Sequence, residues 1–482
     1  MIKRIGRILL LVMVMTMASC RTYDSASLPG NIQMAPKIEE KTEVTVVEEV
    51  TPAYRDVVLP SYDNESINLY EYTTPPTDKF TDVDFMVASD IHFLSEDLYD
   101  NGGAYKTLVE TSNGQMQYQG KEILEAFIEK VIEREPDYLI LTGDLTVNGE
   151  KLSHIKLAQM LSGVEKHGID VLIVPGNHDI NNVYARSFFG NEQQVTDYVD
   201  FVQFSNIYAN LGPDVAKFKH DKSFSYVVEK DNVWFMMIDS AIYEYNVGQG
   251  YPESAGELSD SQAQWFEEIL NLADQENKEM MTFMHHNMVA HADVSPLYLG
   301  DFMVAGASHG TSQYLASRDM NVVFSGHIHC HDIAGIRYDD TFIYDITTGA
   351  LITYPHNYRV CTVSEKGTLS IKTKTITTIK SDPNFGAFSK NQAYQKRGGF
   401  GKVEGASEAD AIVMQAYANT VANAYFEGTD DKIFDNRDNI SGYALWQSQT
   451  GRTSEMILGM SHDTEPRDRD ISIDLNTGYW LE

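Results

Sequence analysis

Two histidines one residue apart, His327 and His329, follow a short apolar segment of the chain. The segment Asn321 to Phe324 predicts a buried strand. Gly326 then lets the chain turn sharply and brings backbone close to whatever lies at the strand end. Neutral imidazole is the commonest side-chain ligand for metals. The pair therefore indicates a metal site, although a His-x-His pair on a strand edge is also an ordinary surface feature.

Residues of metal-binding type also follow four earlier predicted strands. The apolar segments Val83 to Ala88, Asp137 to Leu141, Val171 to Val174 and Met280 to Met284 have the length and composition of buried strands. Helical periodicity between the first three predicts βαβ units, and the carboxyl ends of their parallel strands meet at one edge of a sheet. The donors at the strand ends are Asp90, His92, Asp144, Asn177, His178, His285, His286, His327 and His329.

This mixture of carboxylate, amide and imidazole suits Mn, Fe, Zn or Co, and it excludes thiolate zinc or iron–sulfur chemistry. The set is too large for one tetrahedral ion, whereas two ions about 3.5 to 4 Å apart that share a carboxylate would use all of it. Three residues at or next to the strand ends have two interpretations each. Asn177 is a ligand or only turns the chain, Asp239 is a partner of a ligand or a cap, and Cys330 is a sulfur ligand or a small buried hydrophobe.

In this order and spacing the donors resemble the calcineurin-like metallophosphoesterases. The chain contains that family's Asp-x-His, Gly-Asp, Gly-Asn-His-Asp, lone His and Gly-His-x-His blocks between about Val83 and Thr375. The resemblance implies an α/β fold, a four-layer β-sandwich flanked by helices with the site at its edge. It also implies that the first ion is bound by Asp90, His92 and His329, that Asp144 bridges, and that the second ion is bound by Asn177, His285 and His327. The family's lone His is doubled here, and His285 is preferred because it lies nearest the strand end, with His286 as the alternative.

The expected cofactor is a pair of Mn, Fe or Zn ions. Two such cations lower the pKa of a bridging water and bind the phosphoryl oxygens. The expected reaction is hydrolysis of a phosphomonoester or phosphodiester by in-line attack of a metal-bridging hydroxide. His178 adjoins a ligand without being needed for coordination, so it is the candidate acid, with Asp179 orienting it. His286, Arg186 and His291 are candidate substrate contacts. The alternative function is a catalytically silent surface binding protein that retains a structural metal site.

The first 20 residues have the parts of a bacterial lipoprotein signal peptide. Lys3, Arg4 and Arg7 precede an apolar run, and Met17-Ala18-Ser19-Cys20 resembles a lipobox with Met17 where Leu is usual. We expect an exported protein of the cell envelope, anchored in the membrane through Cys20; ordinary secretion with loss of Cys20 is the alternative. Residues 21–80 are rich in proline and lack a sustained period, which predicts an extended tether.

The formal charge of −33 argues against binding of nucleic-acid polymers, so we expect a small phosphate ester or a lipid headgroup as partner. Only Cys330 and Cys361 follow Cys20, which excludes a disulfide framework. Residues 81–378 are the expected metallophosphoesterase domain. Within it, Ile180 to Lys230 is predicted to be an irregular aromatic insertion beside the site. Residues 379–482 are predicted to form a small C-terminal accessory region that packs on this domain.

Overall fold

The computed structural model describes residues 79–112, 114–292, 309–396, 406–462 and 466–481. The predicted signal peptide with Cys20, and nearly all of the predicted tether, lie outside these residues. Among the helices that the structure describes, none combines the length and apolar character that a membrane span requires.

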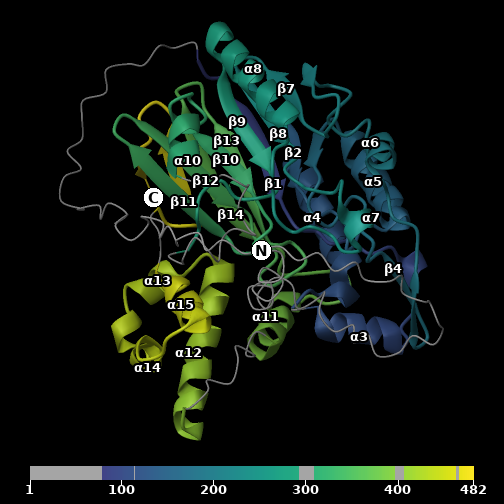
Figure 1. The fold of residues 1–482 in the computed structure, drawn as a ribbon, viewed down its shortest axis with the longest axis vertical. Helices are drawn as coiled ribbons and strands as arrows, with labels where there is room; N and C mark the ends of the chain where they lie inside the picture. Colours follow the sequence, from purple (N-terminus) through teal and green to yellow (C-terminus); the bar gives the residue numbers. More distant parts are fainter. Residues whose placement is uncertain (1–78, 113, 293–308, 397–405, 463–465, 482) are drawn as a thin grey trace, which may run out of the picture. The chain divides into compact units, whose positions relative to one another are not determined.

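Two seven-stranded sheets form the centre of the fold (Figure 1). The first has the strand order β16-β15-β14-β13-β1-β2-β3, in which β1, β2 and β3 are parallel. This parallel arrangement confirms the prediction made from the alternating strand and helix patterns. The strands of the first sheet are β1 (Val83–Ala88), β2 (Tyr138–Thr142), β3 (Asp170–Val174), β13 (Asn357–Val363), β14 (Thr368–Thr375), β15 (Ile471–Asp474) and β16 (Trp480–Leu481).

The second sheet has the order β11-β12-β10-β9-β8-β7-β6, and its strands β12, β10, β9 and β8 are parallel. Every residue of β8, β9 and β10 is buried, which explains why these strands are almost continuous apolar runs in the sequence. The strands of this sheet are β6 (Phe218–Lys219), β7 (Tyr226–Lys230), β8 (Val233–Ile238), β9 (Glu279–Met284), β10 (Val322–Ser325), β11 (Asp332–Tyr338) and β12 (Thr341–Thr347).

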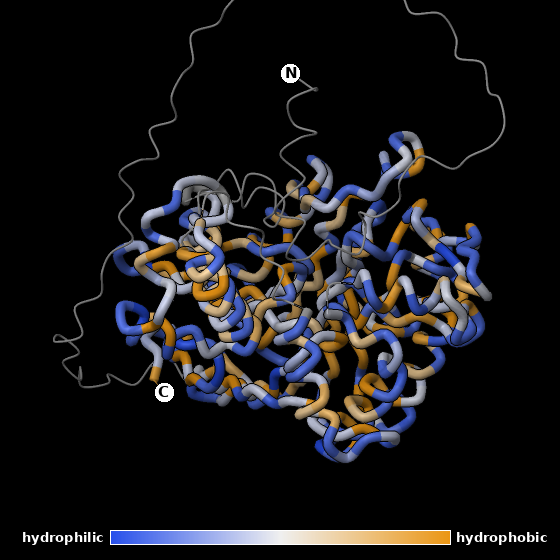
Figure 2. Tube along the Cα trace, turned by 90° about the horizontal axis from the view of Figure 1, so that it is seen from below, coloured by the Kyte–Doolittle hydropathy of each residue, from blue (hydrophilic) through white to orange (hydrophobic). Residues whose placement is uncertain are grey.

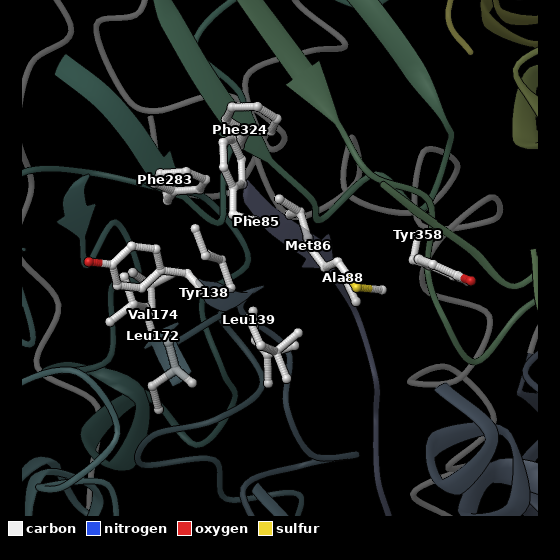
Figure 3. Close-up of a cluster of buried hydrophobic side chains, with 14 of the residues drawn as sticks. Phe85, Met86, Ala88, Tyr138, Leu139, Leu172, Val174, Phe283, Phe324 and Tyr358 are labelled. Atoms are coloured by element: carbon white, nitrogen blue, oxygen red, sulfur yellow. The ribbon is translucent and has the colours of Figure 1, made fainter. Parts of the chain in front are cut away.

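The main hydrophobic core lies between the two sheets. Phe85 of β1 meets Phe235, Phe283 and Phe324 of the second sheet edge to face, with ring centroids 5.7, 5.8 and 5.5 Å apart. Figure 3 shows Phe85 beside Phe283 and Phe324. Edge-to-face aromatic pairs prefer a defined geometry and stabilise beyond the area that they bury. These rings therefore hold the two sheets in one relative position. Figure 2 shows hydrophobic segments running through the middle of the described part.

Helices cover the outer faces of both sheets. The apolar side chains of α4 (Gly120–Arg134) and α5 (Lys151–Glu165) join the main core against the first sheet. Alternate residues of β8 point away from that core and form a second cluster with α8 (Asp260–Glu276) and α10 (His309–Ala316). The order helix, sheet, sheet, helix confirms the predicted four-layer α/β sandwich. Helix α8 begins after Ser259, which forms a capping box with Gln262.

The prediction that Ile180 to Lys230 is irregular was wrong. This segment contains a hairpin of β4 (Arg186–Phe189) and β5 (Glu192–Val195), helix α6 (Phe201–Ile207), β6 and β7, and β7 pairs with β8 of the second sheet. These elements are only two to seven residues long, too short for a period to be visible. Four further short elements lie outside this segment: the 3₁₀ turns η2 (Glu96–Leu98) and η3 (Gln117–Gln119), and helices α3 (Gly103–Thr111) and α7 (Asn246–Gln249).

The C-terminal segment contributes both helices and sheet strands. Its helices are α11 (Phe385–Lys396), α12 (Glu408–Glu427), α13 (Asp431–Phe434), α14 (Tyr443–Gln447) and α15 (Arg452–Gly459), with the 3₁₀ turn η5 (Arg437–Asn439). Helices α12, α14 and α15 share a third apolar cluster, which includes Cys330. Of the two interpretations of Cys330, the structure thus supports the buried hydrophobe. Strand β15 pairs with β14, so the expected accessory region also supplies two strands of the first sheet, which the sequence analysis did not anticipate.

Candidate metal centre

The loops that follow β1, β2, β3, β9 and β10 meet at one edge of the two sheets, as their parallel order requires. Backbone hydrogen bonds connect them: Asp90 N donates to Gly143 O at 3.1 Å, and Gly326 N donates to His285 O at 3.0 Å. The predicted donors at these strand ends are buried, except His178, which is partly buried. The structure brings together Asp90, His92, Asp144, Asn177, His285, His327 and His329, in two overlapping groups described below.

The backbone at this edge adopts an uncommon conformation. Asp90, His92, Asp144, His327 and His329 have φ angles of 51, 42, 48, 69 and 60°, in the left-handed region that non-glycine residues rarely occupy. Such residues cluster at functional sites because the surrounding structure holds them in place. Five of the seven expected ligands therefore have a backbone conformation that a purely structural strand end does not need.

Two glycines allow the loops to approach one another. A Cβ atom built on Gly326 would lie 1.9 Å from Ser89 Oγ and 2.7 Å from Asp90 Oδ2. One built on Gly143, where φ is +92°, would lie 2.6 Å from His285 Nδ1. The close backbone approach expected at Gly326 is confirmed, and the atoms it meets belong to the loop that carries the first ligand.

The first group of donors comprises Asp90, His92, Asp144 and His329, whose donor atoms lie within 4.8 Å of one another. His329 Nε2 is 3.2 Å from Asp90 Oδ1 and 3.1 Å from His92 Nε2. Asp90 Oδ1 is buried and accepts no hydrogen bond from any residue in the described ranges. A buried carboxylate oxygen facing two imidazole nitrogens without a hydrogen-bond donor fits a site for a cation.

The second group comprises Asp144, Asn177 and His285, with the His327 ring centroid 5.0 Å from that of His285. His285 Nε2 lies 3.1 Å from Asn177 Oδ1 and 3.4 Å from Asp144 Oδ2. The same Asp144 oxygen lies 3.6 Å from His92 Nε2 in the first group. Asp144 Oδ1 accepts a hydrogen bond from His178 N at 2.9 Å. One oxygen of Asp144 thus faces both groups, as the position of a bridging ligand requires.

The hydrogen bonds of the two adjacent histidines distinguish between them. His285 Nδ1 donates to Thr142 O at 2.8 Å, so its Nε2, which faces Asp144, is the ring nitrogen left for a metal ion. His286 Nε2 donates to Ser254 O at 3.1 Å, and its Nδ1 contacts Ser240 Oγ at 2.8 Å. Both ring nitrogens of His286 are therefore already hydrogen-bonded. Although His286 lies in one cluster with His285 and His327, the geometry favours His285 as the ligand.

Electrostatic effects leave two of the donors, His92 and Asp144, ready to bind a cation. Burial lowers the pKa of His92 to about 3, which keeps this imidazole neutral. Burial opposes ionisation of Asp144, but the adjacent His285, His178 and His92 outweigh it and hold the pKa of Asp144 well below its usual range. Metal ligands must be deprotonated to bind, and both residues meet this condition at neutral pH.

Asp179 does not orient His178 as the sequence suggested. His178 is partly buried, and its Nδ1 donates to the backbone carbonyl of Val147 at 2.6 Å. The Asp179 carboxylate instead accepts hydrogen bonds from the backbone N–H groups of Leu145, Thr146 and Gly176 at 3.1, 3.0 and 2.8 Å. The prediction that Asp179 orients His178 was therefore wrong: Val147 orients it, and Asp179 holds two ligand loops together. A backbone carbonyl has no signature in the sequence, which is why this contact was missed.

Arg186 and His291 are engaged elsewhere, so the structure gives no support to their predicted contact with substrate. The Arg186 guanidinium donates to Val183 O and Ala185 O of its own turn. The buried His291 ring contacts the carboxylates of Asp332 and Asp345. Of the two interpretations of Asp239, the structure supports the cap, since its carboxylate accepts hydrogen bonds from Phe224 N, Ala241 N and the Tyr243 hydroxyl.

The chain is similar in sequence to known phosphoesterases. The family model of the calcineurin-like phosphoesterases matches residues 83–331, about half of the chain. The chain is 37% identical over 70 residues to a probable cyclic nucleotide phosphodiesterase of Ruthia magnifica, a match that covers 14% of this chain and 29% of that protein. It is 24% identical over 227 residues to a probable glycerophosphodiester phosphodiesterase GpdQ of Arcobacter nitrofigilis, covering 45% of this chain and 67% of that protein.

Among solved structures, a dimetal phosphatase from Danio rerio is similar over 61% of this chain and 96% of its own, with 13% sequence identity and a TM-score of 0.44. The match to the Ruthia magnifica protein spans less than a third of that relative. The family model covers all five donor loops, from Asp90 to His329. The chain belongs to the calcineurin-like phosphoesterase family.

Proposed function

We propose that this protein is a metal-dependent hydrolase of phosphate esters that uses two metal ions, with phosphodiesters as the preferred substrates. The observation that carries this proposal is the position of Asp144 Oδ2, which lies 3.6 Å from His92 Nε2 and 3.4 Å from His285 Nε2. A single buried oxygen that faces two donor groups suits two ions with a shared ligand. The relatives reported above carry the names of phosphodiesterases, which supports the substrate class.

The residues of the chain have separate tasks in this reaction. Asp90, His92 and His329 would hold one ion, Asn177, His285 and His327 the other, and Asp144 both. When bound, a pair of Mn, Fe or Zn ions supplies activation of water and neutralises charge on the phosphoryl oxygens. The Nδ1–H of His178 is held by Val147 O, so in the doubly protonated ring the Nε2–H would be the group that passes a proton to the departing alkoxide, leaving the neutral ring. The His178 ring lies 4.9 Å from that of His92, which places it beside the first group.

The test is hydrolysis by purified protein that has been stripped with EDTA and reloaded with Mn, Fe or Zn. We expect hydrolysis of bis(p-nitrophenyl) phosphate to exceed that of p-nitrophenyl phosphate, with glycerophosphodiesters and cyclic nucleotides as natural probes. Asp144→Ala is expected to abolish turnover and to lower the metal content by elemental analysis. His167→Ala removes an exposed histidine at the end of α5 and serves as the control.

A protein that binds two metals per chain but hydrolyses none of these esters would contradict the proposal. That result would favour the alternative of a binding protein with a structural metal site. A preference for the monoester would contradict only the proposed substrate class.

We also propose that the protein is exported and anchored in the membrane through a lipid on Cys20. The support is the sequence alone, namely a basic, apolar and lipobox-like N-terminus. Expression with radiolabelled palmitate should label the wild-type protein and send it to the membrane fraction, while Cys20→Ser should be unlabelled. A wild-type protein that is soluble and unlabelled would contradict this.

A further inference from the structure

Three buried aspartates meet away from the metal centre, where β11 contacts the C-terminal helices. Asp332 is the first residue of β11, Asp430 follows α12, and Asp468 precedes β15. They are 1, 2 and 2% exposed, and their carboxylate oxygens lie within 4.8 Å of one another. Figure 1 shows α12 to α15 grouped together, and Cys330, two residues before Asp332, packs in their apolar cluster. The chain thus brings three carboxylates to one buried point from positions far apart in sequence.

Two of these carboxylates present an oxygen that has no hydrogen bond. Asp332 Oδ1 and Asp430 Oδ1 are buried and accept no hydrogen bond from any residue of the described segments. Asp430 occupies the N-cap position of α13, where an aspartate ordinarily accepts a hydrogen bond from its own helix, but its side chain makes no such bond. Its carboxylate is directed to Asp332 and Asp468 instead. Buried charged oxygens without donors are costly unless a cation accompanies them.

Two cationic side chains beside this cluster, His291 and Arg359, also have other partners. The His291 ring contacts Asp332 but is shared with Asp345, at 3.3 Å from its Oδ1. The buried Arg359 guanidinium donates to the backbone carbonyls of Asp468, Asp332 and Thr347, at 2.8, 3.1 and 2.7 Å, and not to a carboxylate. His291 therefore divides its contacts between two carboxylates, and Arg359 donates to backbone oxygens.

We propose that Asp332, Asp430 and Asp468 bind a structural divalent cation, and that the ion is Ca²⁺. The donors are carboxylate oxygens, which suit hard cations and distinguish this site from the imidazole-rich metal centre. Ca²⁺ accepts six to eight oxygens in flexible geometry, so backbone carbonyls or water can complete its coordination. Mg²⁺ demands near-octahedral geometry and keeps several waters, which suits a buried site less well.

This ion would connect the C-terminal helices to the loop that carries two metal ligands. Asp332 lies three residues after His329, and His331 N donates to Tyr425 O of α12 at 3.4 Å. A cation that binds Asp332 together with Asp430 and Asp468 would therefore fix the start of β11 against the C-terminal segment. Removal of the ion should mainly lower the stability of the protein. Activity should fall only as far as the loop that carries His329 is displaced.

The experiment measures thermal unfolding of the full chain after treatment with EGTA, with Ca²⁺ or Mg²⁺ added back. At a Ca²⁺ concentration 100-fold above the Kd, we expect the wild-type midpoint to rise by about 3 °C. Asp430→Asn, and Asp430→Asn combined with Asp468→Asn, should lose this rise and the bound calcium detected by elemental analysis. Asp435→Asn makes the same charge change at an exposed position on the same segment and should respond like wild type. His285→Ala in the metal centre should keep the Ca²⁺ response, which separates this proposal from the proposed function.

The competing explanation is a proton shared by the carboxyl groups, since burial and the charge of Asp332 raise the pKa of Asp430 to about 7. In that case wild-type protein contains no calcium and gains no stability from it, while the Asn variants are as stable as wild type. That outcome would overturn the proposal. A Ca²⁺ response that survives in the double Asn variant would do so too, because the ion would then bind elsewhere.

Discussion

Replacing Gly326 by alanine tests whether close packing of two loops builds the metal centre. A Cβ atom at this position would lie 1.9 Å from Ser89 Oγ, 2.9 Å from Ser89 Cβ and 2.7 Å from Asp90 Oδ2, whereas ordinary contact begins at 3.4 Å. The worst contact is too short by about 1.5 Å. Because Ser89 is fully buried, it has no open space to move into, and the two loops must separate.

The size of the effect follows from this displacement. Overpacking a buried site by one methyl group costs about 1–3 kcal/mol. For the 374 residues that the structure describes, this corresponds to a fall of roughly 1–4 °C in the unfolding midpoint. Moving a reacting or ligating group by about 1 Å costs roughly 100-fold in rate. Gly326→Ala moves Asp90 and His327 together, so activity should fall about 100-fold while stability changes little.

The assay is phosphodiester hydrolysis beside thermal unfolding and metal content. Ser89→Gly removes both Ser89 atoms that the new methyl group meets, so the double variant Ser89→Gly/Gly326→Ala should regain part of the lost activity. Gly163→Ala is the matched control: this glycine lies in α5 with nothing within 4 Å of its added Cβ. It should keep full activity and gain up to about 1 kcal/mol of stability.

Gly326→Ala protein with wild-type activity would refute the packing argument. So would a double variant no better than the single one, because the loss would then have another cause.

Three further predictions concern single histidines. His285→Ala should lower activity by more than about 100-fold with loss of bound metal. His286→Ala removes a residue that supports the ligand and should lower activity by about 10- to 100-fold. The reverse order of the two losses would make His286 the ligand. His178→Ala should lower kcat by about 10²- to 10⁴-fold with the metal content unchanged, and loss of metal would instead identify it as a ligand. Burial lowers the pKa of His154 from 6.5 to about 3. As the pH falls from 6.5 toward 3, His154 therefore binds a proton in the unfolded chain but stays neutral in the native chain. Stability should therefore fall with decreasing pH by at most about 1.4 kcal/mol per unit from this group. His154→Gln should flatten the urea-unfolding stability profile between pH 6.5 and 4, and an unchanged slope would contradict the assignment.

The sequence alone determined which residues could meet at the centre. Buried parallel strands are visible as apolar runs, and a donor placed just after such a run must lie at the carboxyl edge of the sheet. That local rule located Asp90, Asp144, Asn177, His285 and His327 without coordinates. It also identified Gly326 as a point of close approach, because only glycine tolerates one.

Only the tertiary structure decided how these residues are used. Whether His285 or His286 faces Asp144 depends on Thr142 O and Ser254 O, and backbone carbonyls are the same at every position of a sequence. The support of His178 by Val147, and the meeting of Asp332 with Asp430, depend on contacts between segments whose spacing is unrelated to any local period. Residue type and periodicity express what one segment prefers, whereas the direction of a lone pair and the pairing of distant charges exist only once the chain has folded.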